Sequence, residues 1–121
     1  MSAKIKFYGY KKCGTCIKAE KYLRNANIEF EFIDITQHPP AAEELAEFSE
    51  NADVSLNKLF NTSGLQYREL NIKEKLPSLT NQEILDLLAS NGRLIKRPLI
   101  TDGKRVSIGF REEQFEKVWG K

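Results

Sequence analysis

The chain has 121 residues, a length typical of one domain. Of these, 40% are hydrophobic and 30% are charged, as in ordinary soluble globular proteins. No apolar run approaches the about 20 residues needed to span a membrane, and the N-terminus lacks the apolar core of a signal peptide. The composition therefore excludes membrane proteins, secreted mini-proteins and disordered chains, and we expect one cytoplasmic domain over residues 1–121.

The net charge of +2 is too small to indicate nucleic-acid binding, but the charges are unevenly distributed. Residues 4–24 contain seven Lys or Arg and one Glu, whereas residues 25–53 contain eight acidic residues and no Lys or Arg. Residues 92–105 are basic again. This asymmetry concerns local fields and partners, not the fold. We expect no direct nucleic-acid partner and no membrane partner.

The first 35 residues predict a strand, a helix and a second strand. Alternating polar and apolar residues favour a strand over 4–10, and helical spacing predicts a helix that begins near Gly14 and runs to residue 27. Aromatic and β-branched residues over 28–35 are typical of another strand. Such a unit makes a parallel pair of strands. Pro39 and Pro40 are then placed to open the next helix.

The middle of the chain, approximately residues 40–92, predicts a helical insertion. Its expected helical segments are residues 43–50, a short turn capped by Ser55, residues 65–72, and a helix that follows a capping-box pattern at residues 80–83 and ends at Asn91-Gly92.

The last part of the chain predicts a hairpin and a final helix. Residues 98–101 and 105–108 flank Asp102-Gly103, a dipeptide typical of hairpin turns. Residues 110–121 predict a helix. Its expected inward residues are Phe115, Val118 and Trp119. The whole order is βαβ, helical insertion, ββα, which predicts an α/β fold with a mixed sheet.

Both cysteines lie in the segment Lys12-Cys13-Gly14-Thr15-Cys16, between the first strand and the first helix. A structural zinc site needs about four Cys or His ligands, and the chain offers two Cys and the distant His38, so we expect no metal site. Two inert buried thiols are another interpretation. Against it, the pair lies at a strand-to-helix turn between basic residues and not on an apolar face.

A third interpretation of the cysteine pair is redox chemistry. The unpaired N–H groups at a helix N-terminus favour a Cys13 thiolate, and Lys11, Lys12 and Lys18 add positive charge that lowers a thiol pKa. Cys16 lies one helical turn further on and can resolve a mixed disulfide formed on Cys13. A C-x-x-C pair beside a βαβ unit favours this interpretation.

Further segments carry a resemblance to a known family. They are Tyr10-Lys11-Lys12-Cys13-Gly14-Thr15-Cys16-Ile17-Lys18-Ala19, residues 59–70 (LFNTSGLQYREL), Leu94-Ile95-Lys96-Arg97-Pro98-Leu99 and Val106-Ser107-Ile108-Gly109-Phe110. Through them the chain resembles the arsenate reductase/Spx family of thioredoxin-like proteins over essentially its whole length. It is most similar to a bacterial branch of uncharacterised small proteins. The resemblance implies a thioredoxin-like fold whose proline loop faces the cysteine motif. Arg97 would then come close to Cys13, and the bond before Pro98 can be cis.

The glutaredoxin-coupled arsenate reductases of this family attack arsenate with one cysteine and hold the oxyanion with three arginines. By resemblance, Cys13 matches the nucleophile and Arg97 one arginine, whereas Leu59-Phe60-Asn61 and Ile108-Gly109 stand where the other two are expected. Asn61 and Thr62 could supply replacement hydrogen-bond donors, or they could belong to a helix-ending turn. We therefore expect weak or absent arsenate reduction.

The Spx branch uses its C-x-x-C pair as a redox switch and binds the C-terminal domain of the RNA polymerase alpha subunit. Three functions thus stay open: a thiol–disulfide redox protein, a redox-sensing regulator that binds polymerase, and a protein whose cysteine pair is vestigial. For the first we expect Cys13 to attack and Cys16 to resolve. The expected catalytic residues are Cys13, Cys16 and Arg97, and the expected stabilising residues are Lys12, Gly14, Thr15, Asn61, Thr62 and Pro98. We expect a monomer with no bound cofactor, reduced by glutathione with glutaredoxin or by thioredoxin.

Overall fold

A computed structural model describes residues 5–120, so Lys4 and Lys121 of the predicted terminal elements lie outside the described residues. The chain forms two compact units. One combines the segment up to Asp34 with the segment from Arg97 onward, and the other is Ile35–Lys96. The helical insertion predicted at about 40–92 falls inside the second unit. Within the described part, no helix combines the length and apolarity that a membrane crossing requires.

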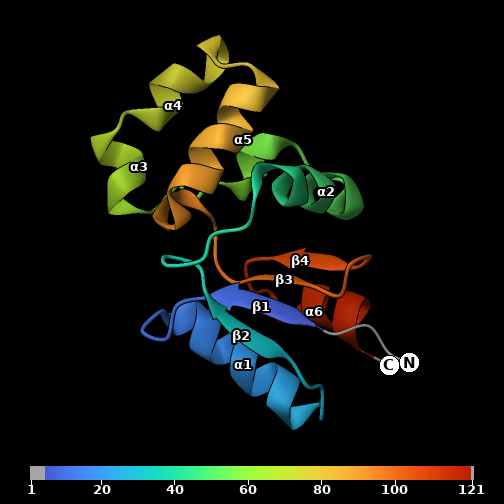
Figure 1. Ribbon diagram of the computed structural model, residues 1–121. Helices are drawn as coiled ribbons and strands as arrows, with labels where there is room; N and C mark the ends of the chain where they lie inside the picture. The colour runs from blue at the N-terminus through green and yellow to red at the C-terminus, as the bar shows by residue number, and fades with distance from the viewer. Residues whose placement is uncertain (1–4, 121) are drawn as a thin grey trace. The chain divides into compact units, whose positions relative to one another are not determined.

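The first unit contains a mixed four-stranded sheet (Figure 1). Its strands are β1 (Lys6–Gly9), β2 (Glu31–Asp34), β3 (Leu99–Thr101) and β4 (Val106–Ile108), in the order β2-β1-β3-β4. Strand β1 is parallel to β2 and antiparallel to β3, and β3 is antiparallel to β4. The predicted fold class, a thioredoxin-like α/β mixed sheet, is confirmed.

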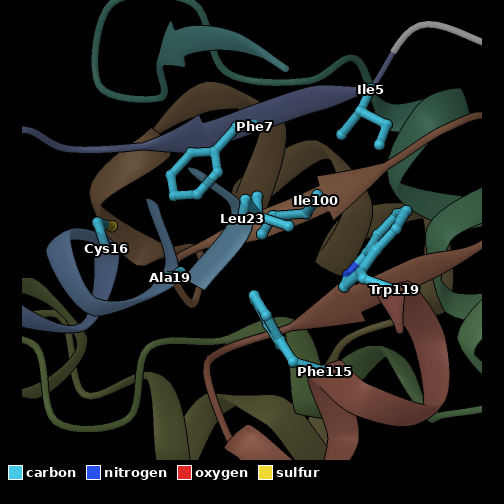
Figure 2. Close-up of a cluster of buried hydrophobic side chains, with 8 residues drawn as sticks. All are labelled: Ile5, Phe7, Cys16, Ala19, Leu23, Ile100, Phe115 and Trp119. Carbon is cyan, nitrogen blue, oxygen red and sulfur yellow. The ribbon is translucent and has the colours of Figure 1, made fainter. Parts of the chain in front are cut away.

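Helices α1 (Gly14–Asn25) and α6 (Glu112–Trp119) cover the same face of this sheet. One buried cluster joins side chains of both helices to side chains of β1 and β3, as Figure 2 shows. Its members are Ile5, Phe7, Cys16, Ala19, Leu23, Ile100, Phe115 and Trp119. The inward positions predicted for the final helix are confirmed for Phe115 and Trp119, and Val118 packs against the cluster partly buried. Cys16 is therefore a core residue of the first unit, and the expectation that the pair lies off the apolar face is wrong for Cys16.

Most element boundaries in the first unit differ from the sequence predictions by one to three residues, and two of these differences have a clear backbone cause. Strand β2 begins at Glu31 and not at residue 28, because Asn27 takes a left-handed conformation (φ 60°) and the Ile28 N–H bonds back to the Leu23 carbonyl at 2.9 Å. Helix α6 begins at Glu112 and not at residue 110, since Arg111 is its extended N-cap residue.

The hairpin exists, but its turn is longer than predicted. Thr101 pairs with Val106, so the four residues 102–105 connect β3 to β4, one more than the predicted strand bounds leave. The Asp102 carboxylate accepts hydrogen bonds from the N–H groups of Lys104 and Arg105, at 3.0 and 2.7 Å, and this stabilises the wider turn. Gly103 supplies a positive φ of 99° within it.

The second unit is helical, as predicted. Its elements are α2 (Ala42–Ala52), η1 (Leu56–Leu59), α3 (Leu65–Glu69), α4 (Ile72–Lys75), η2 (Leu76–Ser78), α5 (Asn81–Ser90) and η3 (Gly92–Leu94). The capping box before α5 is confirmed: the Glu83 N–H donates to Thr80 Oγ1 at 3.1 Å, and the Thr80 N–H donates to Glu83 Oε1 at 2.9 Å.

Three local predictions in the helical unit were wrong: the cap at Ser55, the helix start at the two prolines, and the single helical stretch over residues 65–72. Ser55 makes no side-chain cap to η1, and Pro39 and Pro40 precede Ala41, the N-cap residue of α2, instead of opening the helix. The single stretch predicted over 65–72 is divided, because Asn71 takes a left-handed conformation (φ 52°) between α3 and α4.

Gly92 does not act as the left-handed helix terminator that the Asn91-Gly92 pair predicted. Asn91 ends α5 in an extended conformation, and Gly92 opens η3. The position needs glycine because a Cβ there would lie 1.8 Å from the backbone oxygen of Ile35.

Candidate functional site

Cys13 occupies the N-cap position of α1. Its backbone is extended (φ −81°, ψ 121°), and its N–H donates to the Tyr10 carbonyl at 3.1 Å, which closes the turn between β1 and α1. The Ile17 N–H donates to the Cys13 carbonyl at 3.0 Å and starts the helix. This places a partly buried thiol at the positive end of a helix dipole.

Cys16 lies one turn further along α1 and faces the core (Figure 2). Its side chain is fully buried, and its sulfur accepts a hydrogen bond from the Tyr10 N–H at 3.5 Å. A Cβ on Gly9 would lie 3.0 Å from this sulfur and 2.6 Å from a ring carbon of Phe7. The glycine thus leaves the room that the Cys16 sulfur occupies beside the sheet.

The two thiols have opposite pKa shifts. Burial raises the pKa of Cys13, but the backbone N–H of Cys16, the Cys16 thiol and the Arg97 guanidinium outweigh it, so that the pKa lies below its ordinary value. Burial, together with the neighbouring Cys13, raises the pKa of Cys16 to about 12, although the hydrogen bond from the Tyr10 N–H acts in the lowering direction. At neutral pH the thiolate form is therefore more favoured at Cys13 than at Cys16, and the thiolate is the reactive form of a cysteine.

Arg97 begins the second chain segment of the first unit and lies near this site. The Arg97–Pro98 peptide bond is cis, and the Pro98 carbonyl accepts a hydrogen bond from the Gly109 N–H at 2.9 Å. The Arg97 guanidinium carbon lies 5.8 Å from the centre of the Tyr10 ring. The structure thus brings together Cys13, Cys16 and Arg97, the three residues that the sequence singled out as catalytic.

The lysines near the motif have different surroundings. The Lys11 ammonium lies 3.6 Å from Glu20 and 4.2 Å from the centre of the Phe32 ring. Lys12 is exposed. The charged side chain that lowers the Cys13 pKa is that of Arg97. A stabilising role for Lys12 stays a prediction.

Tyr10 is a residue of the site whose role the sequence did not indicate. Its carbonyl holds the Cys13 backbone, its N–H reaches the Cys16 sulfur, and its ring contacts Arg97. An aromatic residue three positions before Cys13 was the available signal. Its partner Arg97 lies 87 positions further along the chain (97 minus 10), so no local pattern connects the two.

The other predicted residues lie in different places. Gly14 and Thr15 are exposed at the start of α1. Asn61 and Thr62 belong to the second unit, where the Asn61 N–H donates to the Leu94 carbonyl at 2.7 Å and the Asn61 carbonyl accepts from the Gly64 N–H at 3.0 Å. Asn61 is thus part of a turn between η1 and α3, and a role of Asn61 and Thr62 toward Cys13 stays a prediction.

A metal centre would need more ligands than the cysteine pair offers. Over residues 5–120, no three His, Cys, Asp or Glu side chains gather where they could hold a metal ion. His38 is exposed in the second unit.

Comparisons with known proteins identify relatives over nearly the whole chain. The chain matches the ArsC family over residues 8–118. It is 53% identical over 115 residues to the uncharacterized protein YusI of Bacillus subtilis, covering 95% of this chain and 98% of YusI. It is 26% identical over 113 residues to the global transcriptional regulator Spx of Listeria monocytogenes, covering 93% of this chain and 85% of Spx. A crystal structure of a putative ArsC family related protein from Bacteroides fragilis superposes with a TM-score of 0.91 at 41% identity, covering 97% of this chain and 98% of that one. These matches confirm the resemblance stated from the sequence.

Proposed function

Because this chain belongs to the ArsC family, we propose that it is a thiol–disulfide redox protein in which Cys13 attacks and Cys16 resolves. The observation that carries this proposal is the contrast between the two thiols. Cys13 is partly exposed at the N-terminus of α1 with Arg97 nearby, whereas Cys16 is buried directly behind it. Such an arrangement is typical of an attacking and a resolving cysteine.

The proposed reaction transfers two electrons. The Cys13 thiolate attacks one sulfur of a disulfide, forms a mixed disulfide with it and releases the other sulfur as a thiolate. Cys16 then attacks the Cys13 sulfur and gives up its proton to the departing substrate sulfur, so that the mixed disulfide bond breaks and the remaining substrate half leaves as a thiol. The substrate disulfide is reduced, and Cys13 and Cys16 become oxidised to an internal disulfide. A thiol reductant then reduces the pair again.

The electrostatics of the pair favour this order of steps. The charge of Cys13 is one of the causes that raise the pKa of Cys16 to about 12. Once Cys13 is bound in a mixed disulfide it carries no charge, so that contribution to the Cys16 pKa disappears. Burial, the largest cause of the raised pKa, stays, but Cys16 becomes easier to deprotonate once Cys13 has reacted.

We expect arsenate to be a poor substrate. Oxyanion binding depends on fixed charge-assisted hydrogen bonds, and the chain has one arginine, Arg97, at the three positions where its resemblance predicts arginines. Glutathione with glutaredoxin, or thioredoxin, is the proposed reductant, and the cytoplasm is the proposed location because a transient disulfide suits a reducing compartment.

A second candidate function is a redox-sensing regulator that binds the alpha subunit of RNA polymerase. The similarity to Spx over 93% of this chain supports it. Polymerase that co-purifies with the chain in one oxidation state of Cys13 and Cys16, and not in the other, would favour the regulator. Turnover of a disulfide with a thiol reductant would favour the redox protein.

The proposal is tested by trapping the intermediate with single-cysteine variants. Cys16→Ser is expected to accumulate a mixed disulfide on Cys13, visible as an adduct by mass spectrometry of the intact protein. Cys13→Ser is expected to stay unmodified at neutral pH, because the remaining thiol is buried. Equal modification of both variants would contradict the assignment of roles.

A further inference from the structure

One face of α1 carries an exposed apolar side chain beside the reactive thiol. Ile17 follows Cys13 by one helical turn and is 52% exposed, although it is a large hydrophobic residue. Gly14 lies next to it, and a Cβ there would meet no atom within 4 Å. The surface of α1 beside Cys13 is therefore open at Gly14 and apolar at Ile17.

The same face is positively charged. Residues at spacings of three and four lie side by side on a helix, which places Gly14, Ile17, Lys18 and Lys21 on one stripe, opposite the buried positions of α1. We call these four residues the α1 docking face. Lys18 and Lys21 are exposed, and within residues 5–120 neither ammonium has an acidic group at ion-pair distance, whereas Lys11 and Arg24 share Glu20.

We propose that the α1 docking face binds an acidic protein segment that carries the disulfide reacting with Cys13. This inference rests on the proposed function and adds the class of substrate. The uncompensated lysines favour acidic side chains on the partner, and Ile17 favours an apolar contact between them.

The length of the α1 docking face favours a protein disulfide over a small disulfide as the substrate. From Cys13 to Lys21 the helix rises about 12 Å at 1.5 Å per residue. A substrate must extend along this distance to contact Ile17 and both lysines while its sulfur is at Cys13. A small disulfide reacts at the sulfur without touching the far end of the face.

The test compares three probes on the full-length protein. Two peptides of equal length carry one cysteine as a mixed disulfide with thionitrobenzoate, beside a leucine and four charged residues, which are Asp in one peptide and Lys in the other. Attack of Cys13 on the peptide sulfur releases coloured thionitrobenzoate. The third probe is the small neutral disulfide formed by 2-mercaptoethanol.

The acidic peptide is expected to react at least about 10-fold faster than the basic one at low salt, because complementary charge accelerates association by 10-fold or more. The ratio is expected to shrink at high salt. The double variant Lys18→Glu/Lys21→Glu is expected to invert the ratio. Its control, Lys73→Glu/Lys75→Glu on α4, makes the same change of net charge at exposed sites and should keep the ratio. The ratio divides the rate with the acidic peptide by the rate with the basic peptide for the same variant. A change in the reactivity of the Cys13 thiol affects both rates equally and therefore cancels from the ratio.

Ile17→Ser is expected to slow the acidic peptide severalfold. Its control is Leu65→Ser, which changes another exposed apolar residue, 67% exposed, in the second unit. Equal rates for both peptides, with normal reaction of the neutral disulfide, would overturn the docking face and leave the redox function intact. No reaction of Cys13 with the neutral disulfide would overturn the redox function itself.

Discussion

Arg97 lies over the ring of Tyr10, with 5.8 Å between the guanidinium carbon and the ring centre. The backbone of the same tyrosine holds both cysteines: its carbonyl accepts from the Cys13 N–H, and its N–H donates to the Cys16 sulfur. One residue of the turn after β1 therefore connects the positive charge that lowers the Cys13 pKa to the two thiols of the pair.

The Tyr10 ring is expected to keep Arg97 near Cys13. Tyr10→Leu removes the cation–π contact, which is worth about 0.5–1 kcal/mol at an exposed site, and is expected to raise the Cys13 pKa and slow its alkylation at neutral pH severalfold. Tyr10→Phe keeps the ring and the backbone contacts and is the matched control. The readout is the rate of Cys13 alkylation by iodoacetamide as a function of pH. Identical profiles for the Leu and Phe variants would show that the ring has no such role.

Removing the charge of Arg97 is also expected to raise the Cys13 pKa. Arg97 lowers the Cys13 pKa, so Arg97→Gln should shift the alkylation profile to higher pH. At a pH below the pKa of a free thiol the variant should react more slowly, and at a pH well above it the two proteins should react alike. Arg97→Lys, which keeps a positive charge, should lie between them. An unchanged profile in Arg97→Gln would exclude Arg97 as a cause of the low pKa.

The parts of the fold that depend on local patterns could be predicted from the sequence. The strand–helix–strand unit, the capping box at Thr80 and the hairpin follow from spacing and side-chain chemistry within a few residues. The wider hairpin turn could not be predicted, because the Asp102 carboxylate competes with the two-residue turn that Asp-Gly favours.

The cysteine pair could be identified as a candidate site from the sequence because both residues belong to one short motif. Arg97 was predicted as a site residue because the family resemblance places an arginine before Pro98. No sequence pattern joins Arg97 to Cys13. The contact of Tyr10 with Arg97 and the close approach of Gly92 to Ile35 stayed hidden, since each joins residues far apart in the chain. Such contacts depend on tertiary structure, which local periodicity does not encode.

Gly92 is expected to be essential for packing in the second unit. A Cβ there would lie 1.8 Å from the Ile35 backbone oxygen, and a backbone cannot move aside as a side chain can. Gly92→Ala should lower the free energy of unfolding by about 1–3 kcal/mol, the usual range for overpacking. Gly14→Ala is the control, because a Cβ there meets open space, and it should stabilise the helix by about 0.4–1 kcal/mol. Urea unfolding followed by circular dichroism measures both, and equal stabilities would contradict the account of Gly92.

The one tryptophan of the chain reports on the first unit. The Trp119 Nε1–H donates to the buried Ser107 hydroxyl at 2.9 Å. Ser107→Ala leaves this donor without its partner, which should cost about 1–3 kcal/mol and change the tryptophan fluorescence of the folded protein. Ser90→Ala, at an exposed hydroxyl on α5, should change stability by less than about 0.5 kcal/mol. A Ser107→Ala protein as stable as the parent would mean that the buried bond is dispensable.

The redox couple itself is the most direct test of the account. The purified protein is equilibrated in glutathione buffers of graded potential, quenched by alkylation and measured by intact mass. We predict a reversible two-electron transition in which Cys13 and Cys16 lose both thiol hydrogens and become protected from alkylation together. A chain that stays reduced throughout, or that ends as a stable Cys13–glutathione adduct, would contradict the proposal that Cys16 resolves what Cys13 attacks.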